Sequence, residues 1–240
     1  VSPDEVAAVE GVDYVVGNGE KNRIFDIVEK KAPVGASRID VGNIFRVKEI
    51  DARPLSRFYG KTRAFLKVQD GCESFCSYCI VPYARGRSRS RTPESVEKQV
   101  IALAENGFHE IVLTGIHLGV YGFDLEEKTS LLKLLKRLDA LPLNVRFRIS
   151  SIEPTEIDAE MLEFLASSRK VCRHLHVPLQ SGDDATLRQM DRKYDAAFYR
   201  SKIENIRERW EGVSIGIDIM AGFPGETKRA FQNSYNLVKD

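Results

Sequence analysis

The sequence lacks the features that mark several common classes of protein. It has only four cysteines in 240 residues, whereas disulfide scaffolds belong to small, cysteine-rich secreted domains. No apolar run approaches the roughly 20 residues that a membrane-spanning helix needs. There is no basic-then-apolar leader and no initiator methionine, so Val1 is not expected to be the natural start. These absences predict a reduced protein of the cytoplasm with no membrane partner.

A strong net charge is also missing. The formal charge of +1 does not by itself indicate a nucleic-acid partner, so the distribution of charge matters more than its sum. Hydrophobic residues make up 42% of the chain and charged residues 30%, which is ordinary for a globular protein. The length suffices for one sizeable domain and a smaller piece.

Three of the four cysteines are gathered in one short stretch. Cys72, Cys76 and Cys79 have the spacing C-x3-C-x2-C, which lets three thiolates face a common point. A structural zinc site uses four protein ligands, and the nearby sequence offers no fourth Cys or His. Iron–sulfur clusters take thiolates, and a cube held by three of them leaves one iron for a small molecule. The spacing therefore predicts a 4Fe-4S cluster that takes part in chemistry.

From residue 63 onward, strand-like and helix-like patterns alternate along the chain. Repeated units of this kind predict an α/β fold with a parallel sheet and right-handed crossovers. The expected strands are 64–68, 110–113, 145–149, 174–177 and 214–220, and the expected helix starts include Thr92, Thr155 and Glu226.

The pattern before residue 63 is weaker. Residues 1–33 contain one strand signal and two helix signals, too few to cover both faces of a sheet, so we expect the tail of a small α/β domain. Residues 34–62 have scattered basic side chains and weak periodicity, which indicates an interdomain linker or an edge strand. Residues 63–240 form the core.

The cysteine motif resembles the signature of the radical SAM enzymes, in which an aromatic residue, here Tyr78, precedes the last cysteine. The string CESFCSYCIVPYARGRSRSR at 72–91 is similar to the methylthiotransferase branch of that superfamily. The resemblance covers nearly the whole chain and is greatest to the group that acts on N6-threonylcarbamoyladenosine in tRNA. Further similar strings are LTGIHLGVYG at 113–122, RFRISSIEP at 146–154, HLHVPLQSGDD at 174–184 and DIMAGFPGET at 218–227.

This resemblance implies an open partial (β/α) barrel, a 4Fe-4S cluster and S-adenosyl-L-methionine bound at its open iron. It also implies that a methylthio group is installed at C2 of N6-threonylcarbamoyladenosine beside the tRNA anticodon, with an electron donor as a second partner. In the family, a preceding domain holds a second cluster and a C-terminal domain binds RNA. We expect this chain to be truncated at both ends and inactive in full turnover, with the second cluster confined to the full-length protein.

Alternatives to this function remain open at the level of the sequence. The same chemistry could act on isopentenyladenosine in tRNA or on a ribosomal protein. The chain could also be a catalytically silent RNA-binding fragment with a structural metal.

Polar and glycine-rich clusters follow the expected strands, and parallel α/β proteins bind ligands at the carboxyl ends of strands. For the implied cofactor, Gln180 or Glu153 could contact the ribose, and Tyr78 could line the adenine slot. Glycine lets the backbone approach a ligand closely. The candidate cofactor-binding residues are Tyr78, Thr114, Gly115, Ser151, Glu153, Gln180 and Gly222.

An arginine run follows the cysteine loop directly. Arg85, Arg87, Arg89 and Arg91 carry guanidinium forks suited to phosphates, and an RNA substrate must have its backbone held outside the pocket. We predict that these four arginines bind RNA, with a solvated loop as the alternative.

The histidines and the fourth cysteine carry weaker signals. His174 and His176 alternate on one expected strand and could form a metal pair, although hydrogen-bonded core histidines are commoner there. His117 follows the second strand and is a candidate substrate contact. Cys172 stands alone, which favours a small buried hydrophobe.

Overall fold

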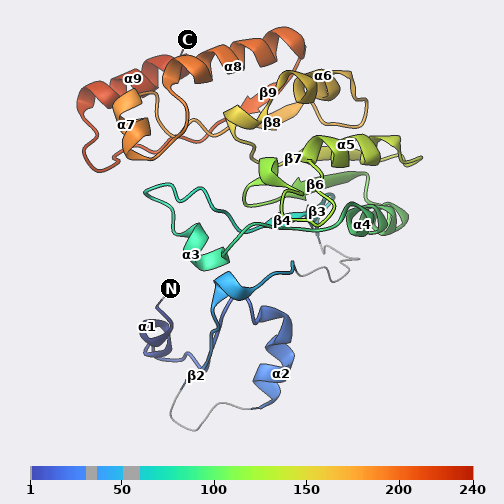
Figure 1. Cartoon of the computed structure of the whole chain (residues 1–240), viewed down its shortest axis with the longest axis vertical. Coiled ribbons are helices and arrows are strands. Elements are labelled where there is room, and N and C mark those ends of the chain that lie inside the picture. The colour runs from blue at the N-terminus through green and yellow to red at the C-terminus, as the bar shows by residue number, and fades with distance from the viewer. Residues whose placement is uncertain (1, 31–36, 51–59, 240) are drawn as a thin grey trace.

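The computed structural model describes residues 2–30, 37–50 and 60–239 (Figure 1). A small unit precedes residue 51, and a larger α/β core begins near residue 60. No helix in the described ranges is both long enough and apolar enough to cross a bilayer. The core carries the cysteine loop, and its strands decide where that loop lies.

Five parallel strands frame the core. β3, β6 and β7 form one sheet with β6 in the middle, and β8 pairs with β9. Single parallel bridges, from Phe147 to Val171 and from Ser151 to His176, join β7 to the β8 segment. The parallel α/β prediction is therefore confirmed. The strands are β3 (Ala64–Lys67), β6 (Glu110–Thr114), β7 (Arg146–Ile149), β8 (His174–His176) and β9 (Ser214–Gly216).

The expected fifth strand at 214–220 is shorter in the structure, because the register between this segment and the one after β8 shifts by one residue. From His176 to Gln180 the chain advances four residues, whereas from Gly216 to Ile219 it advances three. The N–H groups of Leu179 and Gln180 both donate to the carbonyl oxygen of Asp218, at 3.1 and 2.8 Å. Within the described residues, one bridge, from Gln180 to Ile219, continues the pairing. This early end of the ladder leaves polar groups at the carboxyl ends of both strands.

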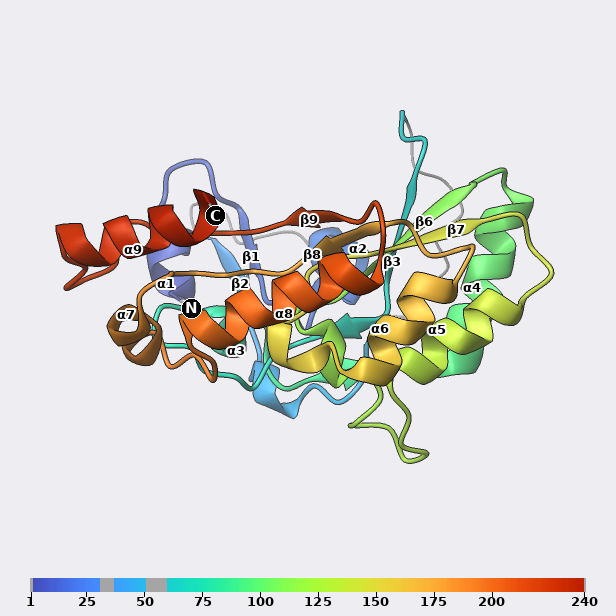
Figure 2. The same ribbon diagram turned by 90° about the horizontal axis from the view of Figure 1, so that it is seen from above.

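Helices α4, α5, α6 and α8 follow one another along the same side of the strands (Figure 2). α4 begins at Thr92, whose Oγ1 accepts a hydrogen bond from Ser95 N at 3.3 Å, as predicted. The helix is followed by Gly107, which has a φ of +84°. The helices after the cysteine loop are α4 (Pro93–Glu105), α5 (Leu131–Ala140), α6 (Ala159–Ser167), α7 (Asp184–Gln189), α8 (Ala196–Arg209) and α9 (Lys228–Lys239).

Two expected helix starts are wrong. Thr155 lies in a single 3₁₀ turn, and α6 starts later, where Asp158 Oδ1 accepts from Met161 N at 2.7 Å. Aspartate is at least as good a helix cap as threonine, so the presence of Thr155 did not by itself fix the start of the helix. Glu226 precedes α9, and its carboxylate accepts from Gly222 N at 2.6 Å.

One apolar cluster holds strands and helices together. Phe147 on β7 and Leu134 on α5 are fully buried in it. Tyr121 is also fully buried, and its hydroxyl donates to the carbonyl oxygen of Arg91 at 2.8 Å, which satisfies the polar end of the ring. Each large side chain buried in this way contributes about 1.5–3 kcal/mol, so the core fixes the strand ends that carry the site.

The small unit is built on two short parallel strands. β1 (Tyr14–Val16) pairs with β2 (Arg38–Asp40), and the helices α1 (Pro3–Ala7) and α2 (Ile24–Glu29) accompany them. β2 lies within 34–62, the segment predicted to be a linker or an edge strand, so this strand extends the unit into that segment. The predicted boundary at residue 33 lies outside the described residues. So do Arg53 and Arg57, two of the basic side chains of the predicted linker.

This unit touches the core beside the cysteine loop. Asn18 Nδ2 donates to the carbonyl oxygen of Ala84 at 2.8 Å. The rings of Phe45 and Tyr83 meet edge to face with centroids 6.4 Å apart. Both contacts reach α3 (Val81–Arg85), the short helix that follows the three cysteines.

Candidate functional site

The cysteine loop is closed at its base by a short antiparallel ladder between β4 (Gln69–Asp70) and β5 (Arg89–Ser90). Residues 71–88 therefore form a loop beyond the carboxyl end of β3. Gly71 opens this loop with a φ of +80°, and a Cβ on it would lie 1.9 Å from the carbonyl oxygen of Arg87. Only glycine fits this conformation and this contact.

Gln69 ties the base of the loop to its neighbours. Its side chain is fully buried, and Nε2 donates to Gly71 O at 2.7 Å and to Ser88 Oγ at 3.0 Å. Its Oε1 accepts from His117 N at 2.8 Å, which brings in the loop after β6. A buried amide with its groups paired in this way fixes the relative position of three segments.

The first cysteine lies beside a histidine–glutamate pair. Cys72 Sγ is 3.6 Å from His117 Nδ1 and accepts from Ser74 N at 3.4 Å, and His117 Nε2 is bonded to Glu156. Burial raises the pKa of the Cys72 thiol, but the bonds from His117 and Ser74 outweigh burial and lower that pKa. Burial lowers the pKa of His117, but Cys72 and Glu156 raise it to about 10. The contacts favour a thiolate, the form that binds metals.

Arg192 connects the second cysteine to an acidic side chain. Its Nη1 is 3.5 Å from Cys76 Sγ, and its Nη2 is bonded to Glu153. The guanidinium also lies 5.0 Å from the ring centre of Tyr194, and its Nε donates to the Tyr194 hydroxyl at 3.2 Å. Glu156 accepts from Glu153 N at 3.1 Å. Polar contacts therefore run without a break from the first cysteine to the second.

The donor set fits an iron–sulfur cluster in kind. Cys72, Cys76 and Cys79 lie on one loop, are partly buried and form no disulfide. Thiols that are free and partly exposed can take up iron as thiolates. Within the described ranges, however, no three potential ligand side chains converge closely enough to hold a metal ion. Cys72 Sγ contacts His117 and Cys76 Sγ contacts Arg192, so these two sulfurs do not face a common point.

A second group of predicted residues gathers where β7, β8 and β9 end. Ser151 Oγ lies 2.7 Å from His176 Nδ1, and His176 Nε2 lies 3.4 Å from Asp218. Gln180 joins this group through its backbone bond to Asp218 and has a φ of +66°, a conformation that side chains rarely adopt. The structure thus brings Ser151 and Gln180 to the same rim.

The other predicted cofactor residues are placed differently. Tyr78 is partly buried on the cysteine loop, and burial raises the pKa of its hydroxyl. Thr114 pairs with Lys67 in the sheet. A Cβ on Gly115 would lie 2.9 Å from Gln69 Oε1, so this glycine packs against the loop base. Gly222 is exposed, and a Cβ there would meet nothing within 4 Å. It follows Met220, whose N–H donates to the carbonyl oxygen of Gln180 at 2.9 Å, so it stays a candidate at this rim.

Two arginines of the run are accessible to solvent and two are buried. Arg87 is exposed and Arg85 partly so, whereas Arg89 and Arg91 are each 5% exposed. Arg89 donates to the carbonyl oxygens of Arg85 and Arg87, both at 2.9 Å, and lies 3.9 Å from Asp70. A buried guanidinium cannot hold a phosphate backbone outside the protein. The RNA-binding prediction is therefore corrected for Arg89 and Arg91 and kept for Arg85 and Arg87.

Several residues of the site were not predicted from the sequence. Gln69, Glu156, Arg192 and Tyr194 hold the loop, yet none belongs to a motif that marks such a role. The one local signal is the spacing of Glu153 and Glu156, which form a capping box around the 3₁₀ turn. Nothing in the sequence around Arg192 indicates that it would contact a cysteine 116 residues away.

Comparison with known proteins covers most of the chain. A model described as the radical SAM superfamily matches residues 66–238. Threonylcarbamoyladenosine tRNA methylthiotransferase MtaB of Bacillus subtilis (strain 168) is 40% identical over 244 residues, which is 100% of this chain and 53% of that protein. A tRNA-2-methylthio-N(6)-dimethylallyladenosine synthase of Clostridium botulinum (strain Okra / Type B1) is 38% identical over 191 residues, which is 80% of this chain and 42% of that protein. The chain spans about half the length of the curated relatives it matches.

Solved structures show the same fold. The cobalamin-dependent S-adenosylmethionine radical enzyme OxsB superposes with a TM-score of 0.63 at 10% identity, covering 93% of this chain and 35% of that one. The radical S-adenosylmethionine methyltransferase TsrM of Kitasatospora setae superposes with a TM-score of 0.61 at 21% identity, covering 74% of this chain and 34% of that one. These likenesses concern the mixed α/β fold alone. Because the superfamily model spans most of the core, including all three cysteines of the loop, the chain belongs to the radical SAM superfamily.

Proposed function

We propose that this chain is part of a tRNA methylthiotransferase that places a methylthio group at C2 of N6-threonylcarbamoyladenosine beside the anticodon. The observation that carries the proposal is the 40% identity, over 100% of the chain, with a protein named for that activity. The dimethylallyladenosine synthases match 80% of the chain at 38% identity, so the longer match favours the threonylcarbamoyl nucleoside. A tRNA, an electron donor and a cytoplasmic location remain predictions for the full-length protein.

Membership of the superfamily implies a 4Fe-4S cluster and S-adenosyl-L-methionine. Cys72, Cys76 and Cys79 would hold the cluster. When bound, the two groups together supply a 5′-deoxyadenosyl radical, which is the chemistry of the cofactor. The second cluster expected from the family belongs to the full-length protein. The chain's own task is to hold the loop and to keep water and unwanted C–H bonds away from it.

The contacts around the loop support that task. His117 and Arg192 each hold one cysteine from a different segment, so the loop is anchored from two sides. Glu153, Ser151 and Gln180 lie on the adjoining rim and are the candidates for binding the ribose and the amino-acid part of S-adenosylmethionine. Tyr78, Thr114 and Gly115 remain candidates because they belong to the loop or pack beside it.

Removing the gene of the full-length protein is expected to abolish one modified nucleoside in tRNA. Mass spectrometry of digested tRNA should show loss of the 2-methylthio derivative of N6-threonylcarbamoyladenosine, while the 2-methylthio derivative of isopentenyladenosine persists. Restoring the gene should restore the first derivative, and a version with Cys72→Ala should not. Loss of the isopentenyl derivative instead would identify the rival substrate. No change in either would favour a protein substrate or a silent RNA-binding role.

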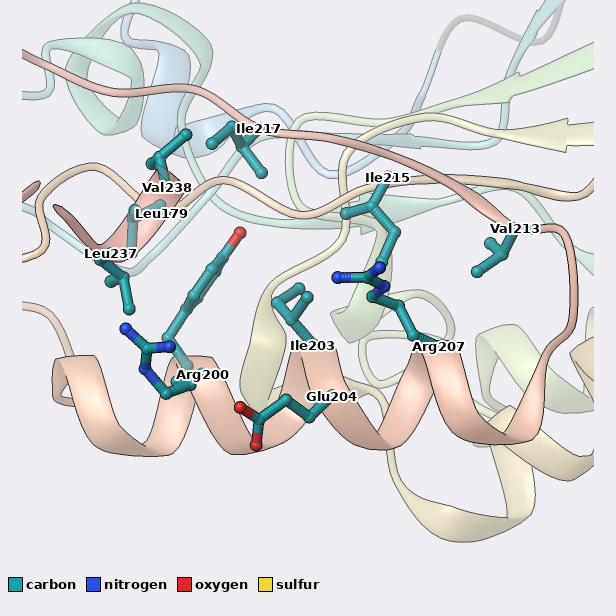
Figure 3. A pocket seen from close by; sticks show the side chains of 11 residues that line it. Leu179, Arg200, Ile203, Glu204, Arg207, Val213, Ile215, Ile217, Leu237 and Val238 are labelled. Carbon is teal, nitrogen blue, oxygen red and sulfur yellow. The ribbon is translucent and has the colours of Figure 1, made fainter. Parts of the chain in front are cut away.

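We infer that the parallel strands belong to the open partial barrel of the sequence prediction and that a longer chain adds a strand beyond β9. Support comes from a cavity of about 570 Å³ between α8, β9 and α9 (Figure 3). Ile203, Ile215 and Ile217 present apolar surface to it, and Arg200 and Glu204 stand at its edge. Curated relatives are nearly twice as long as this chain, which leaves ample sequence to fill such a groove.

Replacing Arg85 and Arg87 with alanine in the full-length protein is expected to weaken tRNA binding and to flatten its salt dependence. If each guanidinium contacts one phosphate, the slope of log K against log salt should fall by about 1.4–1.8 in total. Binding measured over a range of salt concentrations checks this. The matched control is Arg209→Ala with Arg229→Ala, two exposed arginines on α8 and α9. An unchanged slope, or an equal change in the control, would mean that Arg85 and Arg87 belong to a solvated loop that does not bind RNA.

A further inference from the structure

A basic cavity lies at the end of the strands opposite to the cysteine loop. Its volume is about 710 Å³, and its walls come from the starts of β7, β8 and β9 and from the segment after α6. None of the described residues that line it is acidic. Four of them are arginines, namely Arg146, Arg148, Arg169 and Arg173.

The positive charge of this cavity exceeds the negative charge around it. A neighbouring cavity of about 890 Å³ shares three of the arginines and adds Arg63 and Lys170, with Glu110 as the one carboxylate among its described lining residues. α6 ends at Ser167 in the cavity wall, but the negative end of a helix dipole is worth only about half a charge. Burial lowers the pKa of His174, and the charge of Arg148 lowers it further.

Three of the four guanidiniums are held by an acceptor of the chain, while most of their donors stay available. The Nε atoms of Arg146 and Arg148 both donate to Glu110 at 2.7 Å, which orients two guanidiniums and leaves their terminal nitrogens for another acceptor. Arg173 uses one nitrogen on the carbonyl oxygen of Glu211, at 3.0 Å. Arg169 has no hydrogen-bond or ion-pair partner among the described residues. Three oriented guanidiniums and a fourth without a partner, all with unused donors, suit an anionic ligand.

We propose that this cavity binds a phosphate group, carried either by the phosphodiester backbone of an RNA or by a small molecule with a terminal phosphate. Guanidinium forks match phosphate oxygens in bidentate geometry, and several forks converging on one space suit a group with three or four oxygens. The exposed Ser214 adds a hydroxyl at the start of β9. The cavity is distinct from the site of the proposed reaction because its residues lie at the amino ends of the strands.

Calorimetric titration with inorganic pyrophosphate and with a short single-stranded RNA lacking terminal phosphates tests the proposal. Arg169→Ala with Arg173→Ala should weaken binding by about tenfold or more, because two charge-assisted donors are lost. Arg209→Ala with Arg229→Ala removes the same charge elsewhere and should change binding by less than about twofold, since distant exposed charges are screened. Loss of RNA binding alone would identify a phosphodiester ligand, and loss of pyrophosphate binding alone a terminal phosphate. Loss of both would mean that the cavity takes a phosphate group from either source.

Ser214→Asp provides a second test if the double variant fails to fold. It places a carboxylate in the cavity without touching Glu110 and should weaken pyrophosphate binding, while circular dichroism stays unchanged. Three results would overturn the proposal: no binding of either probe by the unaltered chain, equal losses in the cavity and control variants, or unchanged binding in both Arg169→Ala with Arg173→Ala and Ser214→Asp.

Discussion

Cys76→Ala is expected to abolish the absorbance of the reconstituted cluster and the cleavage of S-adenosylmethionine. The loop offers three thiols and no further Cys or His, so a single replacement leaves two of the three ligands of the predicted cluster. Arg192 and Glu153 would still pair with each other, so the fold should survive the change. Iron and sulfide content per chain after anaerobic reconstitution measures the loss directly, and circular dichroism reports on folding.

Cys172→Ser is the matched control for that experiment. Cys172 lines the basic cavity, where burial raises the pKa of its thiol, and it lies at the other end of the strands from the loop. Serine should therefore leave the iron content near that of the unaltered chain. Full iron loading in a variant that lacks Cys72, Cys76 and Cys79 would contradict the assignment. Loss of a quarter or more of the iron in a folded Cys172→Ser variant would make the fourth cysteine a ligand.

The course of the core could be predicted because its signals are local. Alternation of short apolar runs with helical periodicity gave the parallel strands, and Thr92 gave the start of α4. The errors also have local causes. Asp158 is at least as good a cap as Thr155, and the pairing of β9 ends early because the register shifts between Gly216 and Ile219. Periodicity cannot report on either choice, because it does not rank two neighbouring caps and because the register of a strand depends on the partner segment.

Only those parts of the candidate site that consist of residues close together in the sequence could be predicted. The cysteines and the polar strand ends are of this kind, and the structure places Ser151 and Gln180 on one rim. The contacts that hold the loop join residues far apart in the sequence, such as Cys76 and Arg192. The direction in which an arginine points is likewise tertiary information. Arg87 and Arg89 are two residues apart, yet one faces solvent and the other is buried against backbone carbonyls.

Gly71→Ala is expected to destabilise the chain and to lower the occupancy of the cluster. Alanine at a φ of +80° costs about 1–2 kcal/mol by itself. The new Cβ would also lie 1.9 Å from the carbonyl oxygen of Arg87, a backbone atom that cannot rotate away. The free energy of unfolding should therefore fall by about 3 kcal/mol or more, and the loop base next to Cys72 should shift. Denaturant unfolding and iron content measure the two effects.

Gly107→Ala is the control that separates the steric clash with Arg87 from the cost of the backbone conformation. Gly107 has a similar φ of +84°, but a Cβ on it would meet nothing within 4 Å. Its replacement should cost only the conformational part, about 1–2 kcal/mol, and should leave the iron content unchanged because it follows α4, away from the cysteine loop. Equal losses of stability in the two variants would mean that the loop base yields to the new methyl group. Normal iron content in a folded Gly71→Ala variant would show that the cysteines do not depend on this turn.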